Sequence, residues 1–137
     1  MRATGTFRVE TFTAADVAPV VEIATALPVG VAVMEKRYEG DVSGRSATVF
    51  TSAFDQASGV GTYVAMESFE GSLNGVAGAF NFWHAASTTG ADRGHESFMI
   101  VPSSGTGSLA SITGGGGMAI DADGTHRVWF DYELPAG

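Results

Sequence analysis

The sequence contains no cysteine, which removes several kinds of site at once. Without thiols the chain has no disulfide framework, no thiolate zinc site and no cysteine nucleophile. At 137 residues it is nevertheless long enough to bury one core without disulfides or a structural metal. We therefore expect a single domain over 1–137, and the lack of cysteine fits a reducing cytoplasm.

Basic residues are also scarce, because seven Lys and Arg stand against fifteen Asp and Glu, a formal net charge of −8. Nucleic acid is a polyanion whose binding normally requires a basic surface, so we expect no nucleic-acid partner.

Long apolar runs are missing from the sequence as well. No stretch approaches the roughly 18 apolar residues of a transmembrane helix, and segment 1–12 has no apolar core of signal-peptide length. The sequence predicts a cytoplasmic protein without a membrane partner.

Glycine is abundant, and the nineteen glycines are spread among valines, threonines and phenylalanines. This mixture is typical of strands joined by tight turns. Strand-like segments predict an all-β fold of eight or nine strands with little helix: 4–12, 29–39, 45–54, 60–69, 76–84, 95–101, a strand ending at 112, 118–121 and 126–134. Their even spacing indicates an antiparallel barrel or sandwich, and closure into a barrel is favoured because it removes exposed edges.

Three connections between these segments have distinctive compositions. Residues 13–28 contain Pro19 and Pro28, which leave little room for a helix, so we expect an irregular crossing. Residues 85–94 are expected to form a long polar loop. The glycines Gly114–Gly117 are expected to form a flexible turn, since no Lys-Ser or Lys-Thr follows them as in a phosphate-binding loop.

Four segments together carry a resemblance to a known family. They are RYEGDVSGRS at 37–46, GTYVAMESFEGSLNGVAGAFNFWH at 61–84, VPSSGTGSLASITG at 101–114 and HRVWFDYEL at 126–134. In order and spacing they resemble a bacterial family known as a domain of unknown function, whose fold is similar to the allene oxide cyclase barrel. The resemblance implies an antiparallel barrel with a central cavity. It supplies no reaction and no catalytic residue, so the link to the cyclases is an analogy of fold.

Turn geometry predicts which side chains face that cavity. If Glu70–Gly71 is a two-residue hairpin turn, Glu67 pairs with Asn74, and the face that carries the phenylalanines is the inner one. Further turns at 54–59 and 40–41 extend this face to neighbouring strands. The inner residues that we single out are Glu35, Arg37, Ser46, Phe50, Tyr63, Glu67, Phe80, Phe82 and His84. One β-bulge would reverse the alternation of a whole strand.

Three of these residues are candidate catalytic groups: Glu35, Glu67 and Tyr63. A carboxylate inside an apolar barrel has a raised pKa unless Arg37 offsets it, and such a group can act as a general acid or base. The alternative is a structural or solvated ion pair at the barrel mouth. The candidate substrate-binding residues are Arg37, Ser46, Phe50, Phe80, Phe82 and His84.

His84 is expected to lie far from Glu67. It is separated from Asn74, the expected partner of Glu67, by roughly 30 Å of strand at about 3.3 Å per residue, so this register predicts no direct contact. We also expect no metal, because a site at His84 and His95 would need a carboxylate such as Glu96 or Asp92, and no HxH or HExxH spacing supports it.

No cofactor is expected either. GTGSLA at 105–110 fits a dinucleotide-binding pattern, but that site requires a helix to begin at the glycines, and none is predicted.

Trp83 and Trp129 fall on the face opposite Phe82 and Phe130. If the phenylalanines point inward, both tryptophans lie outside, which favours a homo-oligomer interface; with reversed alternation they would line the cavity.

The sequence thus predicts a barrel that handles a small, largely apolar molecule. One hypothesis is a cofactor-independent cyclase or isomerase that holds its substrate in the cavity and moves a proton. The alternative is a non-catalytic binding protein for a small hydrophobic ligand. A barrel filled by its own phenylalanines would instead be a scaffold for assembly.

Overall fold

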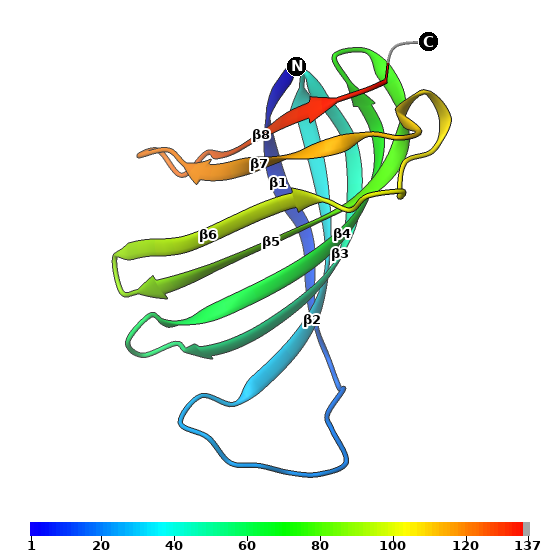
Figure 1. The fold of residues 1–137 in the computed structure, drawn as a ribbon. Helices are drawn as coiled ribbons and strands as arrows, with labels where there is room; N and C mark the ends of the chain where they lie inside the picture. Colours follow the sequence, from blue (N-terminus) through cyan, green and yellow to red (C-terminus); the bar gives the residue numbers. More distant parts are fainter. Residues whose placement is uncertain (136–137) are drawn as a thin grey trace.

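A computed structural model of the chain describes residues 1–135 and shows a closed barrel of eight antiparallel strands (Figure 1). The strands are β1 (Arg2–Ala15), β2 (Val29–Gly40), β3 (Val42–Asp55), β4 (Val60–Leu73), β5 (Val76–Thr89), β6 (Asp92–Ile100), β7 (Thr113–Ile120) and β8 (His126–Glu133). Each strand pairs with the next along the chain, and β8 closes on β1. The predicted all-β barrel is confirmed. No helix in this part of the chain is long or apolar enough to cross a bilayer.

The hairpin between β4 and β5 turns at Asn74 and Gly75, which have positive φ angles of 50° and 81°. Asn-Gly is a preferred dipeptide for a two-residue hairpin turn, because both residues tolerate the left-handed conformation. The turn expected at Glu70–Gly71 is therefore wrong, and Glu67 pairs with Phe82 instead of Asn74. The inner face keeps its predicted members, since Glu67 and Phe82 still share it.

The connection between β2 and β3 contains one residue, Asp41, where two were expected. This difference reverses the alternation of β2, because successive side chains point to opposite faces of a strand. Lys36 and Tyr38 are buried in the barrel, whereas Glu35 and Arg37 are exposed on its outer face. The inward placement predicted for Glu35 and Arg37 is wrong for this reason.

The glycines Gly114–Gly117 lie inside strand β7 and pair with β8, so the expected flexible turn is wrong. A Cβ atom at Gly116 would lie 2.1 Å from the carbonyl oxygen of Trp129, and one at Gly117 would lie 2.3 Å from its indole ring. Glycine is required here because β8 and its tryptophan approach β7 too closely for any side chain.

Two further segments differ from expectation. The long polar loop expected at 85–94 is a tight turn between Thr89 and Asp92, so His84 lies in the middle of β5. The strand expected to end at 112 is replaced by a loop at 101–112 with the 3-10 turn η1 (Gly107–Leu109). Strands β6 and β7 share a single paired position, Met99 with Gly115, and this sparse pairing opens a cleft in the barrel wall.

Aromatic side chains form much of the hydrophobic core, which lies in the half of the barrel near the chain termini. Figure 1 shows both termini at this end of the barrel. The core residues of this half include Tyr38, Leu73, Phe69, Phe80, Phe82, Leu109, Ile112, Phe130 and Tyr132. Trp83 and Trp129 alternate along their strands with the buried Phe82 and Phe130, so they lie on the outer face as predicted. The oligomer interface inferred from the tryptophans stays a prediction.

Candidate functional site

A buried carboxylate, Glu67 of β4, is the centre of the polar cluster inside the barrel. Its side chain is fully buried and accepts hydrogen bonds from four neighbours. Oε1 accepts from the hydroxyls of Tyr38, at 2.6 Å, and Ser46, at 2.7 Å. Oε2 accepts from Lys36 Nζ, at 2.7 Å, and from His84 Nε2. The group is therefore held by donors from three neighbouring strands.

Strand register explains why these side chains meet. Lys36 pairs with Ser46 across β2 and β3, and Glu67 pairs with Thr48 across β3 and β4. On the other side, His84 pairs with Ala65, one inward position from Glu67. Diagonal neighbours on one face of a sheet lie within reach of long side chains.

The hydrogen bonds continue from His84 toward the rim. His84 Nδ1 lies 2.8 Å from the hydroxyl oxygen of Tyr63, and Arg93 donates to that same oxygen at 2.7 Å. Because Glu67 is ionised, it accepts the Nε2 proton of His84. His84 Nδ1 is then an acceptor for the Tyr63 hydroxyl. A continuous chain therefore runs from Arg93 through Tyr63 and His84 to Glu67.

The charges in the cluster follow from burial and pairing. Burial alone would raise the pKa of Glu67, but the hydrogen bond from His84 and the charge of Lys36 outweigh it and lower this pKa to about 2. Burial lowers the pKa of His84 despite its carboxylate partner. Lys36 already balances the one negative charge of Glu67, so His84 is neutral. Burial also raises the pKa of Tyr63, which keeps its proton.

Two hollows border this chain of hydrogen bonds. The first, here called the mouth cavity, has a volume of about 320 Å³ and lies at the barrel end away from the termini. Its walls are aromatic: Phe12, Phe50, Phe54 and Tyr63 line it, with small polar residues between them. Phe50 stacks on Tyr63 with ring centres 5.2 Å apart.

The second hollow, here called the side cleft, is the opening between β6 and β7, with a volume of about 200 Å³. His84, Arg93 and Trp129 are among its lining residues, and Gly116 and Gly117 leave room by lacking side chains. Tyr63 and His84 therefore each line one hollow, while Glu67 lines neither.

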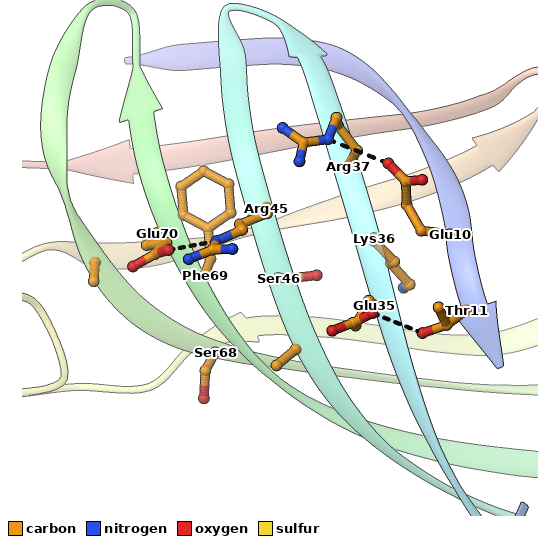
Figure 2. A pocket seen from close by; sticks show the side chains of 12 residues that line it. Glu10, Thr11, Glu35, Lys36, Arg37, Arg45, Ser46, Ser68, Phe69 and Glu70 are labelled. Carbon is orange, nitrogen blue, oxygen red and sulfur yellow. Dashed lines mark hydrogen bonds and ion pairs between the residues drawn. The ribbon is translucent and has the colours of Figure 1, made fainter. Parts of the chain in front are cut away.

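A larger groove of about 620 Å³ lies on the outer face of β1 to β5 (Figure 2). It contains Glu35, bonded to Thr11, and Arg37, paired with Glu10, so both of these predicted site residues belong to the exterior. Exposed ion pairs of this kind are screened by water and contribute little. This groove therefore provides no perturbed acid or base.

The structure brings together four of the predicted residues: Glu67, Tyr63, Ser46 and His84. Phe50 lines the mouth cavity, whereas Phe80 and Phe82 are buried in the packed half of the barrel. The direct contact of Glu67 with His84 overturns the separation expected from the Glu70–Gly71 turn.

Sequence reasoning missed Lys36, Tyr38 and Arg93. The alternation of β2 would have found the first two had the turn been centred on Asp41, but no sequence signal pointed to Arg93. Within residues 1–135, no three His, Cys, Asp or Glu side chains gather as a metal site requires.

Comparison with known proteins places this geometry in a family. A family model described as "Protein of unknown function (DUF3224)" matches residues 3–132. A crystal structure of a protein with unknown function from the DUF3224 family of Shewanella oneidensis MR-1 is similar, with 26% identity and a TM-score of 0.84. The similarity covers 100% of this chain and 98% of that one. No curated protein matches the chain. The chain belongs to the DUF3224 family.

Proposed function

We propose that this protein is a cofactor-independent isomerase or cyclase that moves a proton on a small, largely apolar molecule held in the mouth cavity. One observation carries the proposal: Tyr63 lines that cavity and also begins the hydrogen-bonded chain to His84 and Glu67. Tyr63 thus belongs both to this chain and to the wall of a space of about 320 Å³, the size of a small-molecule site, which supports the proposal.

The resting hydrogen bonds favour Tyr63 as a base. The Tyr63 proton is directed at His84 Nδ1, so the phenol oxygen can accept a proton from the substrate as its own proton passes to His84. This step leaves one negative charge on the substrate and one positive charge on His84, while Tyr63 stays neutral. Glu67 stabilises the charge on His84, and Arg93 stabilises the partial negative charge that the phenol oxygen carries while its proton moves to His84. Return of the proton to a different substrate atom completes an isomerisation, with no net change in protons or electrons.

The lining of the mouth cavity supports an apolar substrate. Phe12, Phe50 and Phe54 supply aromatic walls and no charge. A cyclisation would draw on the same features, because a shaped apolar wall folds a flexible substrate and accelerates ring closure by positioning. The expected likeness to the allene oxide cyclase barrel is part of this proposal and supports it by analogy of fold alone.

Binding without chemistry is the second candidate function. The hydrogen bonding of Glu67 favours this function. A fully buried carboxylate that accepts four hydrogen bonds is well suited to a purely structural role. In that case the mouth cavity would hold a small hydrophobic ligand unchanged, and native mass spectrometry of freshly purified protein would detect it.

The test uses 5-nitrobenzisoxazole, a small aromatic molecule whose ring opens when a base removes one C–H proton, giving a yellow phenolate. We expect turnover above buffer that falls with acid as His84 becomes protonated. Tyr63→Phe keeps the ring but removes the hydroxyl, and should lower turnover about 10²- to 10⁴-fold.

Tyr132→Phe is the matched control, because Tyr132 is a buried phenol in the packed half of the barrel, bonded to Asn74. Its turnover should equal that of the wild type. Equal turnover by wild type and Tyr63→Phe, or none above buffer, contradicts a catalytic Tyr63. Binding of 5-nitrobenzisoxazole in the mouth cavity without turnover selects the binding function.

A further inference from the structure

The segment 16–28, which connects β1 and β2, exposes large apolar side chains to water. Val20 is 103% exposed, Ile23 78% and Val21 71%, and none of them belongs to a strand. Figure 1 shows the segment as a broad loop beyond the end of the barrel opposite the termini. Adjacent exposed apolar side chains of this kind are typical of surfaces that contact another group.

The mouth cavity lies beside the base of this segment. Phe12, on the cavity wall, precedes the end of β1 by three residues, and its side chain is 59% exposed. Phe54 on the cavity wall is 43% exposed. Two partly exposed apolar surfaces of one chain, the segment and the aromatic rim of the cavity, are therefore tethered next to each other.

We propose that segment 16–28 is a lid that closes over the mouth cavity when an apolar ligand occupies it. Closure places Val20, Val21 and Ile23 against the ligand and the aromatic rim, so these side chains help to determine which ligands are held. The inference rests on the proposed use of the mouth cavity as a binding site.

Closure of the lid depends on a ligand in the mouth cavity. A lid over an empty space would leave its inner surface without partner atoms, and the dispersion contacts that close packing provides would be missing. A ligand supplies those contacts. The tether makes closure intramolecular, and a half-segment of about six extended residues reaches roughly 20 Å.

Pro19 and Pro28 restrict the backbone of the segment, which lowers the entropy lost when the loop becomes ordered on any surface. The charges of the segment favour the chain's own cavity over another occupant. Asp16 and Glu22 are the charged residues of the segment, and they repel anionic membrane surfaces and a second copy of this acidic chain, whose net charge is −8.

The test measures binding of N-phenyl-1-naphthylamine, a neutral dye that fluoresces in apolar surroundings. The lid variant carries Val20→Ser, Val21→Ser and Ile23→Ser, all at exposed positions, so the fold should be retained. We expect dye affinity to fall about tenfold or more, because apolar contact area is lost from the complex. Dye should also protect segment 16–28 of the wild type from hydrogen exchange.

A matched control removes the same number of exposed apolar side chains from the outer face, as Val33→Ser, Val49→Ser and Val64→Ser. Its dye affinity should match that of the wild type. A second variant, Ser52→Phe, fills the mouth cavity and tests the site itself.

The outcomes separate the lid from the proposed function. If Ser52→Phe leaves dye affinity unchanged, the mouth cavity is not the site and the proposed function fails. If Ser52→Phe weakens binding but the lid variant binds like the wild type, only the lid is overturned. The lid is also overturned if the segment instead mediates a dimer in sedimentation or binding to phosphatidylcholine vesicles, each lost in the lid variant.

Discussion

His84 donates its Nε2 proton to Glu67 Oε2, although the two residues are 17 positions apart on neighbouring strands. The contact exists because the β4–β5 hairpin turns at Asn74 and Gly75, which places both side chains on one face in the middle of the barrel. Through His84 and Tyr63, this contact links the buried ion pair of Lys36 and Glu67 to the rim of the barrel. The stability and the chemistry of the protein therefore depend on the same few groups.

Removal of the Glu67 carboxylate should destabilise the fold strongly. Glu67→Ala leaves Lys36, whose side chain is 4% exposed, as a buried charge without its partner. We expect a loss of about 3 to 5 kcal/mol in the free energy of unfolding, measured by urea denaturation. In Glu70→Ala the lost partner is the exposed Arg45, and the expected change is about 0 to 1 kcal/mol. Similar losses for the two variants would contradict a buried ion pair.

The Glu67 carboxylate also predicts acid sensitivity. Its pKa is lowered from 4.5 to about 2 in the folded protein, so the unfolded chain binds more protons between these values. The stabilisation is complete above pH 4.5 and is lost as the pH falls toward 2; it amounts to roughly 3 kcal/mol. Urea midpoints measured across this range should fall with acid, and Glu67→Gln should flatten the decline. A wild-type curve as flat as that of the variant would refute this prediction.

His84 should add to this acid sensitivity at higher pH. Burial lowers its folded pKa below 6.5, so protonation favours the unfolded chain and stability decreases as the pH falls below 6.5. We expect this part of the pH dependence to disappear in His84→Gln. His95→Asn is the control, because His95 is exposed and has a φ of 53°, which Asn tolerates. If His95→Asn abolishes this pH dependence and His84→Gln retains it, the pH dependence comes from His95 and the prediction is wrong.

A methyl group at Gly116 should disrupt the β7–β8 pairing. The new Cβ would lie 2.1 Å from the carbonyl oxygen of Trp129, so the backbone must shift. We expect Gly116→Ala to lower the free energy of unfolding by about 1 to 3 kcal/mol. At Gly30 a Cβ atom meets nothing within 4 Å, and Gly30→Ala should be neutral or stabilising. Thermal denaturation of both variants measures these changes, and a Gly116→Ala variant as stable as the wild type would contradict the prediction.

Thr48 offers a stabilising substitution. Its side chain is 2% exposed, and Oγ1 has no hydrogen-bond partner among the described residues. Thr48→Val keeps the shape and removes the unpaired hydroxyl, so we expect a gain of about 1 kcal/mol in the free energy of unfolding. Ser46→Ala is the contrasting variant, because it removes a hydrogen bond to Glu67 and should destabilise. Destabilisation by Thr48→Val would show that the hydroxyl is bonded in solution.

Local signals in the sequence were enough to predict the fold class. Glycine-containing turns and strand-like segments between them indicate an all-β barrel, and the predicted range 29–39 differs from β2 by one residue. The glycines of β7 were assigned to a turn because a glycine run usually indicates a flexible turn. In the structure they belong to a strand, and glycine is needed there because the ring of Trp129 on β8 lies too close for a side chain. This contact between strands leaves no local pattern in the sequence.

The candidate site was predictable only in part. Glu67, Tyr63 and His84 were assigned to the inner face correctly, because the wrong turn at Glu70–Gly71 and the observed turn at Asn74–Gly75 leave the same alternation. The distance between Glu67 and His84 was not predictable from that turn, since it depends on the register along the strand as well as on the face.

The sequence by itself determined that this chain forms an antiparallel barrel with phenylalanines inside, because alternation and turn residues act within a few positions of each other. Only the tertiary structure decided which polar groups meet there. The single residue Asp41 in one turn exchanges Glu35 and Arg37 for Lys36 and Tyr38 on the inner face. The physical reason is the two-residue period of a strand: a change of one position in a turn moves every side chain beyond it to the opposite face.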